Sequence, residues 1–173
     1  MTVLLTGGSA CGKSTYAETL AARRPGPRYY IAAMRPYGEE SLAKIERHRR
    51  LRAGKGFIAV ERYTALDGLV LPARGTALLE CICNLTANEM FGGRGYFRDP
   101  FDDIIRGIEA LRAQCDTLIV VTNDVGSGGG DYGEGTLRYI GTLGRINSAL
   151  ASRFDHVLEL VSGIPIPLKG DLP

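Results

Sequence analysis

The chain has 173 residues, of which 45% are hydrophobic and 23% are charged. This length predicts one domain over residues 1–173, and the apolar content is enough for a core. The formal net charge of +2 is too small to favour nucleic acid or a membrane surface as the main partner. No apolar run has the length of a transmembrane helix, and the N-terminus lacks the pattern of an export signal. The four cysteines do not have the spacing of a metal site or of a disulfide framework. We therefore expect a reduced, cytoplasmic protein.

Short apolar runs alternate with longer segments of helical character, which is typical of a mostly parallel sheet with helices on both faces. In chain order the expected strands are Val3–Thr6, Tyr29–Ala33, Phe57–Val60, Ala77–Cys81, Thr117–Thr122 and Val157–Val161. The helices expected between them are Lys13–Arg23, Glu39–Arg52, Leu85–Phe91, Phe101–Gln114 and Thr136–Arg153. The segment Ile164–Leu168 contains two prolines, so it fits only an edge strand or a tail.

Residues 7–14 read Gly-Gly-Ser-Ala-Cys-Gly-Lys-Ser, a complete G-x-x-x-x-G-K-S phosphate-binding motif between an expected strand and an expected helix. Gly7 and Gly12 allow backbone N–H groups to converge on phosphate oxygens. Lys13 would reach the β- and γ-phosphates, and Ser14 would offer its hydroxyl to Mg²⁺. The motif predicts a nucleoside triphosphate site in a P-loop NTPase three-layer α/β fold. The residues expected around the phosphates are Gly7, Gly8, Ser9, Ala10, Cys11, Gly12, Lys13, Ser14 and Thr15.

A second signal is the basic segment 44–52, in which five cations and one carboxylate surround His48, one of two histidines in the chain. Crowded cations bind a triphosphate well, and they favour the neutral imidazole that can act as a nucleophile. On a helix, Lys44, His48 and Arg52 share one face, so a phosphate held by Arg52 could lie beside the ring. Taken alone, the segment also fits a solvated basic helix, and the two interpretations stay open at this point.

Two carboxylates and one loop extend the candidate site. Glu80 ends an apolar strand, where P-loop enzymes place a magnesium-associated carboxylate, although a helix-starting carboxylate is the alternative. Glu61 ends another strand, and the residues alone fit an ordinary surface acid equally well. The glycine-rich stretch 126–135 follows a strand at the edge where α/β sheets bind ligands, so it is either a mobile lid or a flexible connection.

The order and spacing of further segments carry a resemblance that spans nearly the whole chain. They are Thr6–Ser14 with Tyr16–Glu18, Tyr30–Ala32, His48 and Arg49 with Arg52, Glu61, Leu78–Cys81, Thr122–Gly126, Gly144–Asn147 and Val161–Ile164. In these segments the chain resembles the bifunctional adenosylcobinamide kinase and adenosylcobinamide-phosphate guanylyltransferase family of cobalamin biosynthesis. The resemblance implies two reactions. One phosphorylates the aminopropanol hydroxyl of adenosylcobinamide with ATP or GTP, and the other attaches GMP from GTP.

The resemblance also implies roles for individual residues. His48 corresponds to the histidine that becomes covalently guanylylated, and Lys13 is the other expected catalytic residue. Ser14 and Glu80 are implied for Mg²⁺. The nucleotide-binding residues that the family pattern adds are Ala32, Ala33, Met34, Arg49, Arg50, Leu51, Arg52, Glu61 and Glu80. A corrinoid is the implied small-molecule partner, and the implied assembly is a homo-oligomer, a trimer in the family.

This chain departs from the family pattern at Ala33, where threonine is usual, at Asp124, where glutamate is usual, and at residues 139–141, where Phe-Arg-Asp is replaced by Tyr-Ile-Gly. These departures leave the triphosphate and guanylylation residues intact and bear on recognition of the acceptor. Two other functions remain open from the residues alone. One is a P-loop small-molecule kinase without guanylyltransferase activity, and the other is a nucleotide-binding regulator.

Overall fold

The computed structural model describes residues 1–92, 98–126 and 129–173, with all their side chains except those at positions 40, 44 and 51. In this part of the chain seven strands form one sheet in the order β3-β2-β4-β5-β1-β6-β7. The strands are β1 Thr2–Thr6, β2 Arg28–Ala32, β3 Phe57–Glu61, β4 Thr76–Glu80, β5 Thr117–Val121, β6 His156–Val161 and β7 Ile164–Lys169. The helices are α1 Lys13–Ala22, α2 Gly38–Arg52, α3 Ile82–Phe91, α4 Phe101–Gln114 and α5 Glu134–Arg153, with a 3₁₀ turn, η1, at Leu66–Gly68.

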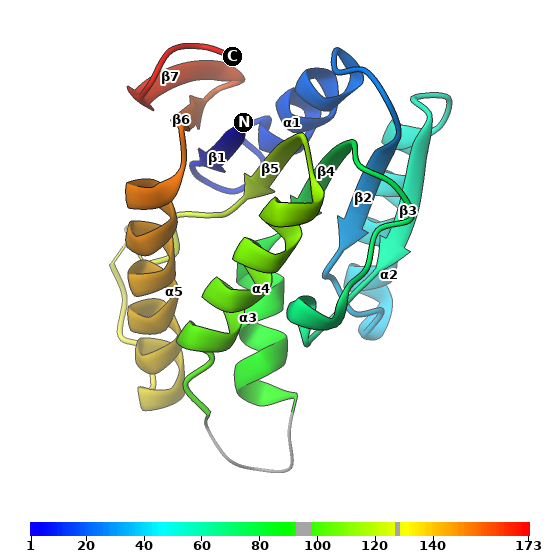
Figure 1. Ribbon diagram of the computed structural model, residues 1–173. Coiled ribbons are helices and arrows are strands. Elements are labelled where there is room, and N and C mark those ends of the chain that lie inside the picture. The colour runs from blue at the N-terminus through cyan, green and yellow to red at the C-terminus, as the bar shows by residue number, and fades with distance from the viewer. Residues whose placement is uncertain (93–97, 127–128) are drawn as a thin grey trace.

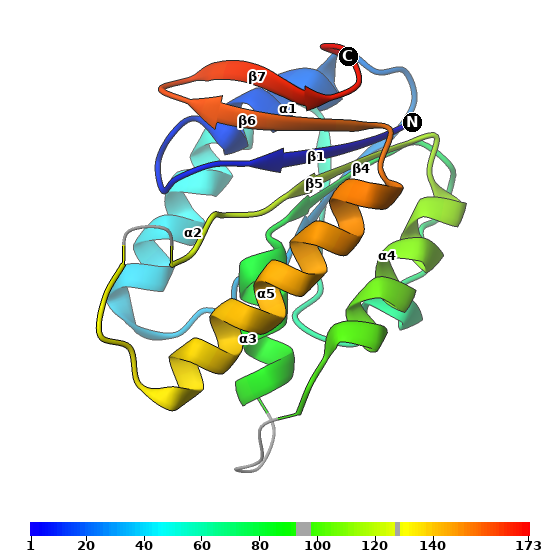
Figure 2. The same cartoon turned by 90° about the vertical axis from the view of Figure 1, so that its left-hand side faces the viewer.

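Helices cover both faces of the sheet (Figure 1). Helices α1 and α2 lie on one face, and α3, α4 and α5 lie on the other, as the rotated view in Figure 2 also shows. The strands β1, β4 and β5 at the centre are apolar nearly throughout because both of their faces are buried. The predicted three-layer α/β fold with a mostly parallel sheet is therefore confirmed. Among the described helices, none combines the length and the apolar character needed to cross a bilayer.

The last strand shows how proline is accommodated in this sheet. Strand β7 pairs antiparallel with β6, and Pro165 and Pro167 lie opposite Leu160 and Leu158. Proline cannot donate a ladder hydrogen bond, but β7 is an edge strand with pairing on one side only. Of the two alternatives for this segment, edge strand and tail, the structure has the edge strand.

Several element boundaries differ from the sequence expectation by one to three residues. Helix α3 begins at Ile82 instead of Leu85, because Ile82 and Cys83 are buried against the sheet and its first turn forms in that contact. Helix α5 begins at Glu134 instead of Thr136, with an acidic residue in the first turn, where the helix dipole favours negative charge. Tertiary burial and end effects of this kind are weakly encoded in local propensity.

The parallel register aligns the carboxyl ends of the strands into one row. Ala32 at the end of β2 is in register with Glu61 of β3 on one side and Glu80 of β4 on the other. Glu80 is in turn paired with Val121 at the end of β5. The fold therefore brings residues from four separate segments to the same edge of the sheet, beside the loop that follows β1. This is the edge at which open α/β sheets bind ligands.

Candidate functional site

The phosphate-binding motif forms a tight turn between β1 and α1 that requires its glycines. Gly7 has φ +132°, and a Cβ there would lie 2.5 Å from the carbonyl oxygen of Leu160. Gly12 has φ +99° and caps α1 without any side-chain hydrogen bond, so the first N–H groups of the helix have no side-chain cap. Such a helix start is a ready-made anion site, because the N–H groups and the helix dipole both favour negative charge.

The Lys13 side chain folds back across this turn. It is 6% exposed, and its ammonium group donates to the carbonyl oxygen of Gly7 at 2.9 Å and also to that of Gly8. The positive charge therefore lies inside the concave side of the loop, where a phosphate would sit. The loop is further supported from the β6–β7 turn, since the N–H of Gly163 donates to the carbonyl oxygen of Cys11 at 2.8 Å.

Glu80 joins the loop to the middle of the sheet. The Ser14 hydroxyl donates to Oε1 of Glu80, and the Tyr30 hydroxyl donates to Oε2 at 3.2 Å. Burial raises the pKa of Tyr30, and the neighbouring Glu80 carboxylate raises it further, so the phenol keeps its proton and acts as a donor. Two hydroxyl donors on different elements thus fix the orientation of the carboxylate at the end of β4.

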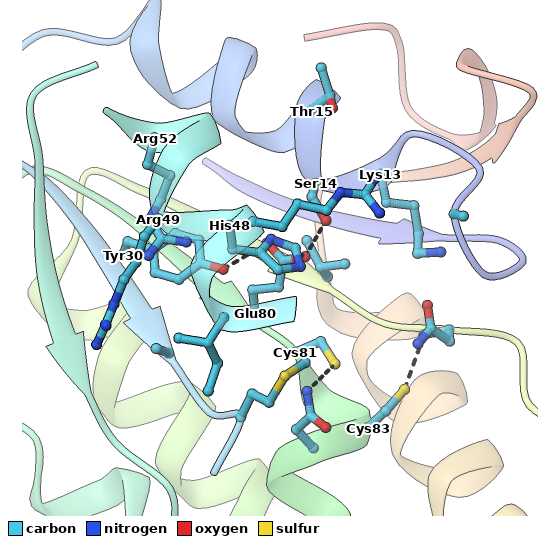
Figure 3. A pocket seen from close by; sticks show the side chains of 18 of the residues that line it. Lys13, Ser14, Thr15, Tyr30, His48, Arg49, Arg52, Glu80, Cys81 and Cys83 are labelled. Atoms are coloured by element: carbon cyan, nitrogen blue, oxygen red, sulfur yellow. Dashed lines mark hydrogen bonds and ion pairs between the residues drawn. The ribbon is translucent and has the colours of Figure 1, made fainter. Parts of the chain in front are cut away.

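Helix α2 brings the basic segment over this carboxylate (Figure 3). The guanidinium carbon of Arg52 lies 3.5 Å from the centroid of the Tyr30 ring, which is the geometry of a cation–π contact. Nδ1 of His48 lies 4.0 Å from Oε1 of Glu80, and this nitrogen is buried without a hydrogen-bond partner among the described residues. At the next position of the helix, Arg49 lies 3.4 Å from the Glu61 carboxylate.

These groups line one pocket of about 460 Å³. The expected site residues on its wall are Ser9, Ala10, Cys11, Gly12, Lys13, Ser14, Thr15, Ala32, Met34, His48, Arg49, Arg52, Glu61 and Glu80. Gly7 and Gly8 belong to the same loop but are not among the residues that line the pocket. Ala33 is buried in the core, and its N–H donates to the carbonyl oxygen of Glu80 at 2.9 Å. Arg50 is exposed on α2 away from the pocket wall, and the side chain of Leu51 lies outside the described residues.

The pocket also contains groups that the sequence analysis did not select. Cys81, Cys83, Asn84 and Asn123 follow the ends of β4 and β5 and line its floor. The neighbouring Cys81 thiol lowers the pKa of the Cys83 thiol below its usual value, and the N–H of Asn123 donates to the Cys83 sulfur at 3.2 Å. These residues directly follow two parallel strands, and the carboxyl ends of parallel strands lie at one edge of the sheet. That position in the sequence is the signal that could have identified them.

The pocket brings together groups that can bind phosphate, hold a cation and act as a nucleophile. An ammonium group and the N–H groups of a helix start that has no side-chain cap lie at the loop cavity, while a carboxylate and a hydroxyl offer hard oxygen ligands beside them. Across the same pocket, an imidazole is presented between two arginines on α2. The arrangement can hold a polyphosphate between the loop and the helix and place a ring nitrogen close to it.

Comparison with known proteins agrees with this geometry. Residues 3–168 match the family model described as cobinamide kinase / cobinamide phosphate guanyltransferase. The chain is 32% identical over 184 aligned positions to the bifunctional adenosylcobalamin biosynthesis protein CobU of Escherichia coli, with 98% of this chain and 100% of that protein covered. It is 33% identical to CobU of Salmonella typhimurium, again with 98% of this chain and 100% of that protein covered. It is 29% identical to the bifunctional protein CobP of Pseudomonas aeruginosa, with 97% of both chains covered.

Solved structures at low identity show the same fold. An ATPase from a type III secretion system superposes with a TM-score of 0.56 at 10% identity, covering 91% of this chain. The present chain spans 50% of that protein. A Pyrococcus horikoshii protein, PH0250, superposes with a TM-score of 0.53 at 9% identity. The superposition covers 99% of this chain and 87% of that protein. The family match over nearly the whole length and the geometry of the pocket lead to one conclusion: this chain belongs to the cobinamide kinase / cobinamide phosphate guanyltransferase family.

Proposed function

We propose that this chain phosphorylates adenosylcobinamide and then transfers GMP from GTP to adenosylcobinamide phosphate through a guanylylated His48. The observation that carries the proposal is the placement of His48. Its ring lines the same pocket as Lys13 and Ser14, although it comes from a different helix on the same face of the sheet. A kinase that uses only a phosphate loop has no need of an imidazole at that place.

In the kinase step, the hydroxyl oxygen of the acceptor attacks the γ-phosphorus of ATP or GTP. A new P–O bond forms as the bond to the β-phosphate oxygen breaks, the nucleoside diphosphate leaves, and the hydroxyl proton is released to solvent. This transfer needs positioning and charge neutralisation, which Lys13 and the N–H groups at the start of α1 would supply to the phosphate oxygens.

The oxygens at the mouth of the loop fit Mg²⁺ by their chemistry. Ser14 Oγ and the Glu80 carboxylate are hard donors and already lie within hydrogen-bonding reach of one another. When bound there, the ion would neutralise charge on the β- and γ-phosphates. Tyr30 would keep the Glu80 carboxylate oriented by its hydrogen bond of 3.2 Å, whether or not the ion is present.

In the nucleotidyl step, a ring nitrogen of His48 attacks the α-phosphorus of GTP. The bond to the β-phosphate oxygen breaks, pyrophosphate leaves, and a phosphoramidate to GMP forms. A phosphate oxygen of adenosylcobinamide phosphate then displaces the imidazole and gives adenosylcobinamide-GDP. Arg49 and Arg52 flank the histidine and would neutralise the pyrophosphate as it departs. Because Nδ1 faces the Glu80 carboxylate, Nε2 is the nitrogen left to face the nucleotide.

The intact mass of the protein after incubation with GTP and Mg²⁺ tests the covalent step. We expect an adduct of one GMP per chain that is stable in alkali and labile in acid. His48→Ala should abolish the adduct. His156→Ala, which changes the other histidine, at the start of β6, should retain it. Labelling that survives His48→Ala would refute the assignment. The absence of an adduct in the wild type would indicate a P-loop kinase without guanylyltransferase activity.

Separate assays of the two steps test the division of labour. We expect His48→Ala to phosphorylate adenosylcobinamide within about threefold of the wild-type rate, since the hydroxyl acceptor needs no covalent nucleotide. The same variant should fail to convert the phosphate to the GDP derivative. Equal loss of both steps in a folded variant would contradict the assignment of His48 to the second step alone.

The family resemblance also supports proposals about assembly and location. We infer a homotrimer that works in the cytoplasm, where ATP, GTP and the corrinoid are available. Light scattering on the purified protein measures the assembly directly, and a monomer at working concentration would contradict the trimer.

A further inference from the structure

Helix α2 carries the proposed nucleophile, yet its described side chains have little contact with the core. None of its described side chains is buried, and those that are not exposed are only half-buried. By contrast, α1 buries Ala17, Leu20 and Ala21 against the sheet. A helix with so little buried apolar surface is positioned by a few specific side-chain interactions, because apolar burial is the main source of tertiary stabilisation for a helix.

One such interaction lies just beyond the C-terminal end of α2. The ammonium group of Lys55 donates to Oε2 of Glu18 at 2.6 Å. Lys55 is three residues past the end of α2, and its own N–H donates to the carbonyl oxygen of Arg52 at 3.1 Å. Glu18 lies on α1, one turn after Ser14. The pair therefore links the end of α2 to the helix that begins in the phosphate loop.

The Glu18 end of this pair is fully buried. Its side chain is 0% exposed, whereas that of Lys55 is 34% exposed, and Oε1 of Glu18 has no hydrogen-bond partner among the described residues. An ionised carboxylate in such a place is strongly destabilised unless a cation accompanies it. Separating the pair would leave the Glu18 carboxylate buried without a cation, which is unfavourable. The pair therefore keeps Lys55, and with it the end of α2, against α1. Neither residue lines the nucleotide pocket, so neither is available to contact the substrate there.

We propose that the Glu18–Lys55 ion pair is the anchor that positions α2, so that His48 faces the phosphate loop during guanylylation. Glu18 is then a positioning residue that acts through Lys55 and the last turn of α2. The inference rests on the proposed role of His48. It differs from that role because it concerns an ion pair outside the pocket, between α1 and the α2–β3 connection.

Glu18→Leu separates positioning from folding. Leucine fills the buried space with apolar atoms, and Lys55 is exposed enough to turn into solvent, so no buried charge is left alone. We expect the variant to remain folded and to form the His48–GMP adduct about tenfold or more slowly, because the nucleophile is no longer held near the α-phosphorus. The kinase step should change by less than about threefold, since it depends on the loop.

Three further variants complete the test. Lys55→Arg keeps a cation opposite Glu18 and should retain most of the labelling rate. Lys55→Ala leaves the carboxylate buried without a partner, so it should lower both the thermal midpoint and the labelling rate. The double variant Glu18→Leu/Lys55→Ala should regain the thermal midpoint, because the lone charge is gone, while it labels as slowly as Glu18→Leu.

A readout independent of activity is hydrogen exchange in residues 44–52. We expect these amides to exchange faster in Glu18→Leu than in the wild type, with the protection of β1, β4 and β5 unchanged. If Glu18→Leu labels at the wild-type rate, or if the double variant recovers labelling together with stability, the pair is a purely structural contact and the inference fails. If the wild type itself forms no adduct at His48, it is the proposed function that fails, and the exchange experiment still reports on the anchor.

Discussion

The phosphate loop and helix α2 form the two sides of the candidate nucleotide pocket, and they are held in different ways. The loop continues a buried central strand, and Lys13 is 6% exposed beneath it. Its backbone at Gly7 packs so closely against the backbone of Leu160 that there is no room for a Cβ, and this contact fixes the loop. Helix α2 lies on the surface of the sheet and is held by Arg52 on Tyr30 and by the ion pair of Lys55.

The difference indicates how two reactions can share one pocket. A site made of backbone groups on a buried frame presents the same N–H groups to every phosphate, so changes there should affect all nucleotide chemistry. A group on a lightly anchored helix can be displaced without unfolding the protein. Substitutions on or near α2 should therefore affect the nucleotidyl step first.

Lys13→Ala should have the largest effect on the loop side. It removes the ammonium group that faces the phosphate cavity, so kcat/KM of the kinase step should fall by about two decades or more, on the order of 3 kcal/mol of transition-state stabilisation. Steady-state assays with ATP and with GTP measure the fall. The free energy of unfolding should change by less than about 1 kcal/mol, because the lost hydrogen bonds go to two loop carbonyls. Phosphorylation at the wild-type rate would remove the loop from the proposed site.

Gly7→Ala and Gly8→Ala form a matched pair that tests the fixed backbone. A Cβ at Gly7 would lie 2.5 Å from the backbone of Leu160 at a positive φ, whereas a Cβ at Gly8 would meet nothing within 4 Å. We expect Gly7→Ala to lower the free energy of unfolding by roughly 2 kcal/mol and Gly8→Ala to change it by less than about 0.5 kcal/mol. Equal denaturation midpoints for the two variants would show that the loop is less constrained than the structure indicates.

Tyr30 contacts both sides of the pocket, through Glu80 and through Arg52, so its substitutions test how the two sides are linked. Tyr30→Phe removes the hydroxyl that donates to Glu80 but keeps the ring under Arg52. It should lower the free energy of unfolding by about 1 kcal/mol and slow the labelling of His48 by less than about threefold, because Ser14 still donates to Glu80. Tyr30→Leu also removes the cation–π contact, so labelling should slow by a further fewfold, at about 0.5–1 kcal/mol for that contact. Identical labelling rates in the two variants would exclude a role for the ring in holding α2.

The exposed pair of Arg49 and Glu61 should show the smallest effect on stability. The two side chains are 59% and 57% exposed and lie 3.4 Å apart, and surface pairs of this kind contribute about 0–1 kcal/mol. Arg49→Gln should therefore leave the thermal midpoint almost unchanged. If Arg49 also contacts the triphosphate, the KM for GTP should rise and its dependence on salt should weaken. A large loss of stability would mean that this pair anchors α2, in place of Lys55.

Much of the fold was predictable from the sequence because the signals were long or covalently constrained. The apolar runs of β1, β4 and β5 match strands buried on both faces, and helix α4 was predicted with its observed bounds, Phe101–Gln114. The start of α3 was missed because its first turn depends on burial against the sheet, which periodicity does not report. The prolines of β7 allowed either an edge strand or a tail, and pairing with β6 decided between them.

The candidate site was predicted in part for the same reasons. Lys13, Ser14, Glu80 and His48 line one pocket, as their expected roles require, and their chemical roles remain proposals. Ala33 was included from the family pattern, but it follows β2 at a position that points into the core. Tyr30 was overlooked as a site residue because, in sequence, it is one of several apolar residues in a strand. Its hydroxyl acquires a role only through the proximity of Glu80, fifty residues away.

By itself the sequence determined the ligand class, since the phosphate loop is a local backbone structure whose glycines, lysine and serine lie within eight residues. It also determined the alternation of strands and helices, because side-chain periodicity is local as well. Packing of the whole chain makes β2, β3, β4 and β5 end in register beside that loop, so that Glu61, Glu80 and Asn123 line one pocket. It alone placed the surface helix α2 over the loop through Glu18 and Tyr30. Contacts between residues far apart in sequence depend on packing of the whole chain, which no local pattern encodes.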